Sequence, residues 1–197
     1  VAKQLLEQGK NIIVIDNLST GFQSTIDTLQ KIKEFDFINL DLNEFEKIEK
    51  VFEKYSIETV IHFAAFSQVG ESMQNPMKYY MNNTVNTTHL VKCASVYGVK
   101  KFIFSSTAAT YGEPTLKGRE QTITEEFDTK PINPYGQSKL MSEKVIIDEK
   151  QNNLFVGRGE HSTPMADPKI YIPYNEHIEI GEFYKIKISG VRGKDMN

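Results

Sequence analysis

The central stretch of the sequence begins with Ser105-Ser-Thr-Ala-Ala-Thr-Tyr-Gly112 and ends, after a polar loop, with Asn133-Pro-Tyr-Gly-Gln-Ser-Lys139. Asparagine is a good helix N-cap and proline a good first helical residue, so the second run predicts the start of a helix. Tyr135 and Lys139 lie four residues apart in that helix, and residues at this spacing share one face. We therefore expect the phenol and the ammonium to be in contact.

Tyr135 and Lys139 are suited to proton transfer. An ammonium next to a phenol favours the ionised form, so the phenol can exchange protons near neutral pH. Thr107 follows the apolar strand Lys101-Phe-Ile-Phe-Ser105 and offers a hydroxyl to the oxygen whose proton Tyr135 handles. The three residues together predict the oxidation of an alcohol to a carbonyl.

The Tyr-x-x-x-Lys pattern is weak by itself. The same spacing separates Tyr97 and Lys101. Gly98 is expected to end the helix that carries Tyr97, and Lys101 to begin the next strand. We therefore do not expect this second pair to share a face, and we assign the proton transfer to Tyr135.

Buried strands alternate with amphipathic helices over residues 1–149. Apolar runs indicate strands at 11–16, 35–40, 59–63 and 101–105, and the 3.6-residue period indicates helices between them. This alternation predicts an α/β fold with a doubly wound, Rossmann-like parallel sheet. In such folds a glycine-rich turn lies about 20 residues before an acidic strand end. Asp16 stands too near the start of the sequence for that turn, so we expect an incomplete sheet that lacks its first strand.

Several candidate binding residues fall where predicted strands end. Ligands of such sheets bind at the carboxyl ends of the strands, and we expect one cleft to collect Asp16, Asp41, Ala64-Ala65 and Ser105 to Thr107. A carboxylate at Asp16 accepts the hydroxyls of an adenosine ribose and repels a 2′-phosphate, which predicts NAD as cofactor. The small side chains of Ala64 and Ala65 let a flat ligand approach the backbone.

The composition argues against several classes of function. A net charge of −3 over 197 residues indicates neither a nucleic-acid binder nor a membrane-surface protein. Cys93 is the only cysteine, which excludes a disulfide framework and a cysteine metal site. We expect Cys93 and His62 to be core residues. No signal peptide and no apolar run long enough for a bilayer is found, so we expect a cytoplasmic protein.

Seven runs stand in consistent order over about residues 1–149: Val14-Ile-Asp-Asn-Leu18, Asp41-Leu42, Val60-Ile-His-Phe-Ala-Ala65, Val69-Gly-Glu-Ser72, Tyr79-Tyr-Met-Asn-Asn83, Phe102-Ile-Phe-Ser-Ser-Thr-Ala-Ala-Thr-Tyr-Gly112 and Pro134-Tyr-Gly-Gln-Ser-Lys-Leu140. Together they resemble the UDP-glucose 4-epimerases of the extended short-chain dehydrogenase/reductase family. The resemblance implies interconversion of UDP-glucose and UDP-galactose through a 4-keto sugar, with NAD kept bound. It also implies a homodimer.

The resemblance also implies residue roles. Tyr135 would be the base and acid at the sugar 4-hydroxyl and would also contact the cofactor. Thr107 would bind the 4-oxygen, and Lys139 would favour ionisation of the phenol and bind the nicotinamide ribose. The remaining cofactor contacts would come from Asp16 and Asn17 at the adenosine ribose, Asp41 and Leu42 at the adenine, and, in the rest of the NAD cleft, Phe63, Ala64, Ala65, Asn83 and Ser105.

A nucleotide-sugar 4,6-dehydratase is the nearest alternative. Those enzymes need an Asp-Glu pair directly after the catalytic Thr, to eliminate the 6-hydroxyl, and Ala108 and Ala109 stand there in this chain. The family's glycine-rich loop and its C-terminal sugar-binding domain are also not found in the sequence, so we expect this chain to be weakly active or inactive as an epimerase.

Residues 150–197 follow a different pattern and are expected to form a small β domain or appendage. Short strands are indicated at Phe155-Val156, Lys169-Ile-Tyr-Ile172 and Tyr184-Lys-Ile-Lys-Ile-Ser189. The segment resembles the TRAM domain of radical-SAM methylthiotransferases, which implies RNA or ribosomal-protein contact. From Gln151 onward six Lys and Arg balance six Asp and Glu, whereas an RNA-binding surface is usually basic. A non-catalytic binding protein with an RNA-contacting tail remains the alternative to an enzyme.

Overall fold

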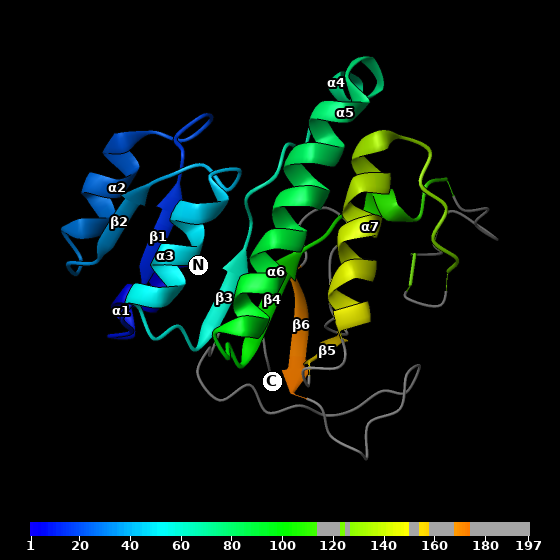
Figure 1. Cartoon of the computed structure of the whole chain (residues 1–197). Coiled ribbons are helices and arrows are strands. Elements are labelled where there is room, and N and C mark those ends of the chain that lie inside the picture. The colour runs from blue at the N-terminus through cyan, green and yellow to red at the C-terminus, as the bar shows by residue number, and fades with distance from the viewer. Residues whose placement is uncertain (114–122, 125–126, 150–153, 158–167, 174–197) are drawn as a thin grey trace. The chain divides into compact units, whose positions relative to one another are not determined.

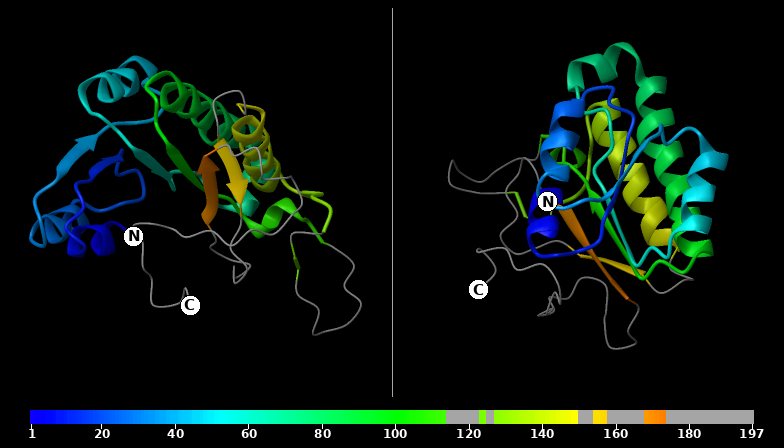
Figure 2. Two further views of the ribbon diagram at one scale, coloured as in Figure 1. Left: turned by 90° about the horizontal axis from the view of Figure 1, so that it is seen from below. Right: turned by 90° about the vertical axis from the view of Figure 1, so that its left-hand side faces the viewer.

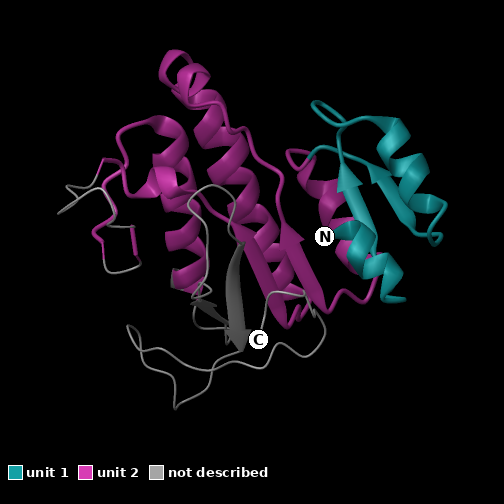
Figure 3. Cartoon of the chain, turned by 180° about the vertical axis from the view of Figure 1, so that it is seen from behind, with its two compact units in different colours: residues 1–41, 176–197 teal, residues 42–175 magenta. Residues whose placement is uncertain are grey.

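The computed structural model describes residues 1–113, 123–124, 127–149, 154–157 and 168–173 (Figure 1). The chain divides into two compact units, one containing residues 1–41 and the other residues 42–175 (Figure 3). No helix in the part of the chain that the structure describes is both long and apolar enough to cross a membrane.

The first unit is one strand, helix and strand repeat preceded by a helix. Its elements are α1 (Ala2–Glu7), β1 (Ile13–Asp16), α2 (Gln23–Gln30) and β2 (Asp36–Asn39). The strands pair in parallel, with Ile13 opposite Asp36 and Asp16 opposite Asn39. Leu6, Ile26 and Phe35 form its buried core. Parallel pairing through a crossover helix brings the carboxyl ends of both strands to one edge.

The second unit holds the other strands and the long helices. In chain order its elements are α3 (Phe45–Lys54), β3 (Thr59–His62), α4 (Val69–Gln74), α5 (Pro76–Tyr79), the π-helix η1 (Tyr80–Val85), α6 (Asn86–Val96), β4 (Lys101–Ser105), the 3₁₀ turn η2 (Ala108–Thr110), α7 (Pro134–Asp148), β5 (Leu154–Gly157) and β6 (Pro168–Pro173). The strand order is β3-β4-β6-β5. The β3 and β4 strands are parallel, whereas β6 runs antiparallel to β4 and β5.

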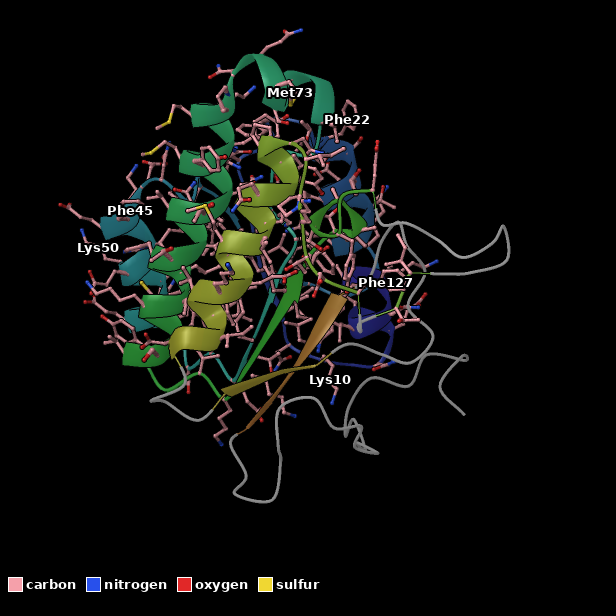
Figure 4. The ribbon with its side chains drawn as sticks, turned by 90° about the vertical axis from the view of Figure 1, so that its right-hand side faces the viewer. Lys10, Phe22, Phe45, Lys50, Met73 and Phe127 are labelled. Carbon is pink, nitrogen blue, oxygen red and sulfur yellow. The ribbon has the colours of Figure 1, made fainter. Side chains whose placement is uncertain are left out.

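The helices α6 and α7 lie on the same face of the β3–β4 pair (Figure 2). Phe102 and Phe104 of β4 are almost completely buried, as is Ile146 of α7. On α3, Phe45 (Figure 4) stacks on the ring of His89 in α6, with the ring centroids 4.3 Å apart. Strand β4 is thus the central element of this unit, and the residues after it lie close to α7.

The predicted alternation of strands and helices in an α/β fold is confirmed, with two differences. The helical region expected at 76–97 is divided into α5, the π-helix η1 and α6. The strands β5 and β6, expected in a separate appendage, instead extend the β3–β4 sheet. The strand expected at Tyr184–Ser189 lies outside the described residues. The domain boundary that the sequence predicts between residues 149 and 150 stays a prediction.

His62 and Cys93 are core residues, as the sequence predicted. Only 4% of His62 and 3% of Cys93 are exposed. His62 ends β3, and its Nε2 atom lies 2.8 Å from the Thr87 hydroxyl of α6. Burial first, and the charge of Lys139 second, lower the pKa of His62 to about 3. The imidazole therefore stays neutral in the folded protein.

The first turn of α7 approaches η2 very closely. The Asn133 side chain accepts a hydrogen bond from the Gly136 N–H at 2.8 Å, which confirms the predicted N-cap. A Cβ atom on Gly136 would lie 2.4 Å from the Ala109 carbonyl oxygen. Only a residue without a side chain fits this contact, so Gly136 allows the helix that carries Tyr135 to lie beside the turn that follows Thr107.

We predict that Gly136→Ala lowers the free energy of unfolding by about 1–3 kcal/mol, because the added methyl group forces α7 and η2 apart. Urea denaturation measures the effect. Gly70→Ala in α4 is the matched control, because a Cβ atom there meets nothing within 4 Å. Alanine is the better helix former, so the control should gain up to about 1 kcal/mol. Equal stability of the two variants would contradict the close contact.

We also predict a pH-dependent stability from His62. The unfolded histidine titrates near its ordinary pKa of about 6.5. The folded pKa is about 3, so only the unfolded state gains this proton between those values. The contribution is complete above pH ~6.5 and is lost as the pH falls toward 3, by about 2 kcal/mol between pH 7 and pH 5. Urea denaturation at several pH values should give a weaker dependence for His62→Gln. If the free energy of unfolding of His62→Gln depended on pH as steeply as that of the parent chain, the neutral buried imidazole would be contradicted.

Candidate active site

Tyr135 and Lys139 are placed by the first two turns of α7. Tyr135 is half-buried, whereas only 3% of Lys139 is exposed. The Lys139 Nζ atom lies 4.3 Å from the centroid of the Phe104 ring in β4, and its positive charge contributes to the lowered pKa of His62 in β3. The ammonium therefore lies over the adjacent carboxyl-terminal ends of β3 and β4.

Thr107 follows β4 and caps η2. Its hydroxyl oxygen accepts a hydrogen bond from the Ala109 N–H at 3.2 Å, and its carbonyl accepts one from the Thr110 hydroxyl at 2.8 Å. A hydroxyl that accepts in this way still carries its own hydrogen, so Thr107 can donate to a ligand oxygen. The contact of Gly136 with Ala109 brings this turn beside the first turn of α7.

The candidate binding residues that follow β3 and β4 start from neighbouring strand ends. This is because His62, the last residue of β3, pairs with Phe104 of β4 in the parallel ladder. Phe63 is 48% exposed, Ala64 is exposed, and Ala65 and Ser105 are half-buried. The second unit therefore collects, at one edge of its sheet, Phe63, Ala64, Ala65, Ser105 and Thr107. Small and hydroxyl side chains with an adjacent ammonium suit a polar ligand with a flat ring.

Asn83 lies inside the protein rather than at an open surface. Only 2% of the residue is exposed. Its amide group accepts from the Phe66 N–H at 2.9 Å and donates to the Phe66 carbonyl and to the Ser138 hydroxyl, each at 3.0 Å. It also accepts from Asn82 at 3.0 Å. Two acceptor and two donor positions are thus used, so a direct contact with a cofactor would have to replace one of these bonds.

The first unit carries the residues predicted for the adenosine end of the cofactor. Asp16 ends β1 and is exposed, and one of its oxygens accepts from the Leu18 N–H at 2.7 Å. Asn17 donates to the Asp41 carboxylate, which follows β2, at 2.6 Å. An exposed carboxylate at the end of a parallel strand fits the hydroxyls of a ribose. Leu42 is the first residue of the second unit.

One buried pair near the site was not predicted from the sequence. Glu143 is 4% exposed and accepts a hydrogen bond from the Ser106 hydroxyl, directly before Thr107. Glu143 also follows Lys139 by four residues, so both charges lie on one face of α7. That spacing was a signal available in the sequence. The pair joins the middle of α7 to the end of β4.

A second contact that the sequence did not indicate involves Tyr79, the last residue of α5. Its ring is completely buried, and its centroid lies 6.3 Å from that of Tyr135 with the ring planes at 75°. The Tyr79 hydroxyl donates to the Glu71 carboxylate at 2.7 Å. The side of Tyr135 that faces α5 is therefore closed by another aromatic residue.

The chain is similar to known sugar-nucleotide enzymes over most of its length. The model of the GDP-mannose 4,6 dehydratase family matches residues 1–160, and a TRAM domain model matches residues 141–197. The UDP-glucose 4-epimerase of Bacillus subtilis is 35% identical over 95% of this chain and 59% of its own length. This chain thus spans less than two thirds of that relative.

Solved structures give the same result. The UDP-Glc/GlcNAc 4-epimerase of Campylobacter jejuni is 48% identical with a TM-score of 0.72, covering 76% of this chain and 44% of its own. The UDP-glucose 4-epimerase of Brucella ovis in complex with NAD is 40% identical with a TM-score of 0.66, covering 75% and 42%. Because the family model matches well over half of the sequence, this chain belongs to the GDP-mannose 4,6 dehydratase family, and it resembles the UDP-glucose 4-epimerases in both sequence and fold.

Proposed function

We propose that this chain carries the reaction centre of an NAD-dependent 4-epimerase that interconverts UDP-glucose and UDP-galactose. The observation that carries the proposal is the arrangement around α7. The first turn of that helix brings Tyr135 next to the Thr107 turn, and the buried Lys139 lies over the ends of β3 and β4. A proton acceptor, a hydroxyl donor and a cation at one sheet edge suit the oxidation of an alcohol.

In this mechanism Tyr135 removes the proton from the sugar 4-hydroxyl and returns it after the 4-keto sugar has turned over in the site. The Thr107 hydroxyl holds the 4-oxygen throughout. The Lys139 ammonium stabilises the phenolate and binds the nicotinamide ribose. NAD held by Lys139 at its nicotinamide ribose would supply reversible hydride acceptance, so that the hydride removed from C4 could return to the other face of the sugar.

The residues of the first unit suit the adenosine end of NAD. Asp16 is exposed at the end of β1 and suits the ribose hydroxyls, while its charge disfavours the 2′-phosphate of NADP. Asn17 and Asp41, which are hydrogen-bonded to each other, would lie at the adenosine. The relative from Brucella ovis was solved in complex with NAD, which supports the same cofactor here.

Elimination of the 6-hydroxyl, the reaction of the dehydratases after which the family is named, is disfavoured. That reaction needs carboxyl groups directly after the catalytic threonine. Here those positions are Ala108 and Ala109, both in η2. A methyl side chain can neither donate nor accept a proton. The 4-epimerase relatives and this pair of alanines therefore favour epimerisation.

We further propose that the protein acts as a homodimer, as the resemblance implies. Three methionines spaced by four residues are largely exposed on consecutive helical segments: Met73 (61%; Figure 4), Met77 (62%) and Met81 (53%). Exposed apolar side chains that are close in the sequence favour burial against a partner. The cytoplasmic location that the sequence favours stays part of this proposal.

We predict that Tyr135→Phe lowers the conversion of UDP-galactose to UDP-glucose by about 10²–10⁴-fold, the usual effect of losing a general acid and base. Bound NAD should be retained, because the phenol hydroxyl does not hold the cofactor alone. Coupled assay of UDP-glucose measures conversion, and fluorescence after borohydride reduction measures the cofactor.

Tyr97→Phe is the matched control, because Tyr97 has the same spacing to a lysine but its hydroxyl donates to Glu53 at 3.2 Å. This variant should keep both the conversion and the bound NAD of the parent chain. A parent chain that carries no NAD would contradict the proposed function for this chain, whose conversion of substrate is expected to be weak. A fully active Tyr135→Phe would contradict the proposed role of the phenol.

A second candidate function is RNA contact through residues 150–197, favoured only by the match to the TRAM domain model. It predicts salt-dependent retention of RNA that falls in Arg158→Ala and Lys187→Ala, as measured by filter binding at several salt concentrations. RNA that is retained equally by the parent and by both variants, or not retained at all, would contradict it. The balanced charge of this segment favours the enzyme.

A further inference from the structure

Tyr79 is the buried aromatic residue that contacts the proposed catalytic phenol. None of its surface is exposed. The rings of Tyr79 and Tyr135 meet edge to face, with the centroids 6.3 Å apart and the planes at 75°. Such pairs have a preferred geometry, so a fixed Tyr79 ring restricts how the Tyr135 ring can turn.

The position of Tyr79 is set by α4 and by the backbone before it. The Tyr79 hydroxyl donates to the Glu71 carboxylate at 2.7 Å and accepts from the Gln68 N–H at 3.1 Å. The same carboxylate forms an ion pair with Lys78. Glu71 belongs to the run Val69-Gly-Glu-Ser72, which has no role in the proposed mechanism. One carboxylate thus holds two successive residues of α5.

A second ring supports Tyr79. Phe66 lies after β3, and its centroid is 6.0 Å from that of Tyr79 with the planes at 55°. The backbone of Phe66 is fixed by both ends of the Asn83 amide, at 2.9 and 3.0 Å. The Lys78 Nζ atom lies 4.4 Å from the Phe66 ring centroid. Tyr79 is therefore in contact with two aromatic residues and with two hydrogen-bonding groups at its hydroxyl.

Tyr79 does not compete with Tyr135 for protons. Burial first, and the hydrogen bond and charge of Glu71 next, raise the pKa of Tyr79 to about 12. The Tyr79 phenol therefore stays neutral at any pH at which an epimerase would be assayed. A buried group that does not ionise and faces the reactive ring has a geometric effect on that ring, rather than a chemical one.

We propose that Tyr79, held by Glu71 and the Gln68 backbone, is a positioning residue that orients the ring of Tyr135 toward the substrate oxygen. The run Val69-Gly-Glu-Ser72 then serves the reaction by fixing α5 rather than by touching substrate. The link to catalysis rests on the proposed function. The control of the Tyr135 ring does not, and it is tested separately.

The first experiment is NMR of the full chain with labelled tyrosine rings, in which the Tyr135 signals are identified by their loss in Tyr135→Phe. The parent chain should show cross-peaks between the Tyr79 and Tyr135 rings. Tyr79→Leu should shift and broaden the Tyr135 signals, because the neighbouring ring is gone. Glu71→Ala, at a side chain that is 36% exposed, should cause a smaller shift in a chain that still folds.

Tyr97→Leu is the matched control, since it removes a tyrosine that is also hydrogen-bonded to a glutamate but far along the sequence from α7. It should leave the Tyr135 signals unchanged. The proposal is overturned if the parent shows no cross-peaks between the two rings. It is also overturned if the Tyr135 signals do not change in a folded Tyr79→Leu or Glu71→Ala chain, or if the control changes them equally.

The second experiment measures turnover of UDP-galactose in the same variants. Tyr79→Leu should lower kcat by about 10–100-fold with KM changed less than about twofold, because a misplaced reacting group affects the chemical step. Tyr79→Phe keeps the ring and should retain most of kcat. A loss in Tyr79→Phe as large as in Tyr135→Phe would show chemical participation and overturn the positioning role. If the parent chain carries no NAD, the proposed function fails, while the NMR result still decides the ring contact.

Discussion

The packing of α7 against β4 and the turn after it is the contact on which the candidate site depends. Three residues of α7 make it: Gly136 approaches Ala109, Lys139 lies over Phe104, and Glu143 accepts from the Ser106 hydroxyl. Their spacing of three and four residues places them on one face of the helix. Two of the three are buried charged residues, which are costly unless partnered. The register of α7 on β4 is therefore strongly specified, and it sets where Tyr135 lies relative to Thr107.

Another face of α7 is fixed by hydroxyl groups rather than by charges. The Ser138 carbonyl accepts from Thr84, and the Ser142 hydroxyl donates to the Asn83 carbonyl. These bonds join α7 to η1, which also holds Phe66 through the Asn83 amide. Strand β4 on one side and the π-helix on the other leave α7 little freedom to shift. Such rigidity suits a site that has to keep a proton acceptor aligned with a substrate oxygen.

Local sequence signals were enough for the strands and for the start of α7. Short, almost wholly apolar runs such as Asn11-Ile-Ile-Val-Ile-Asp16 and Lys101-Phe-Ile-Phe-Ser105 are typical of buried strands. The Asn-Pro pair before Tyr135 indicates a helix start, because asparagine caps the helix and proline suits its first turn. The pairing of β6 with β4 had no such signal, because it joins segments more than 60 residues apart: Phe104 lies opposite Lys169. The hydrogen bond from Asn83 to Ser138 had no local signal either, because the two residues are 55 positions apart.

The π-helix η1 has a consequence for how this region tolerates change. A π turn accommodates one residue more than an α-helical turn, and successive residues of an α-helix are rotated by about 100°. Deleting a single residue between Tyr80 and Val85 would therefore restore regular helical winding and leave the side chains beyond it facing their present neighbours. Thr87, now against His62, would be among them. The π-helix thus takes up one residue without changing the angular phase of α6, and the constraint on this segment comes from residue identity, above all from the hydrogen bonds of Asn83.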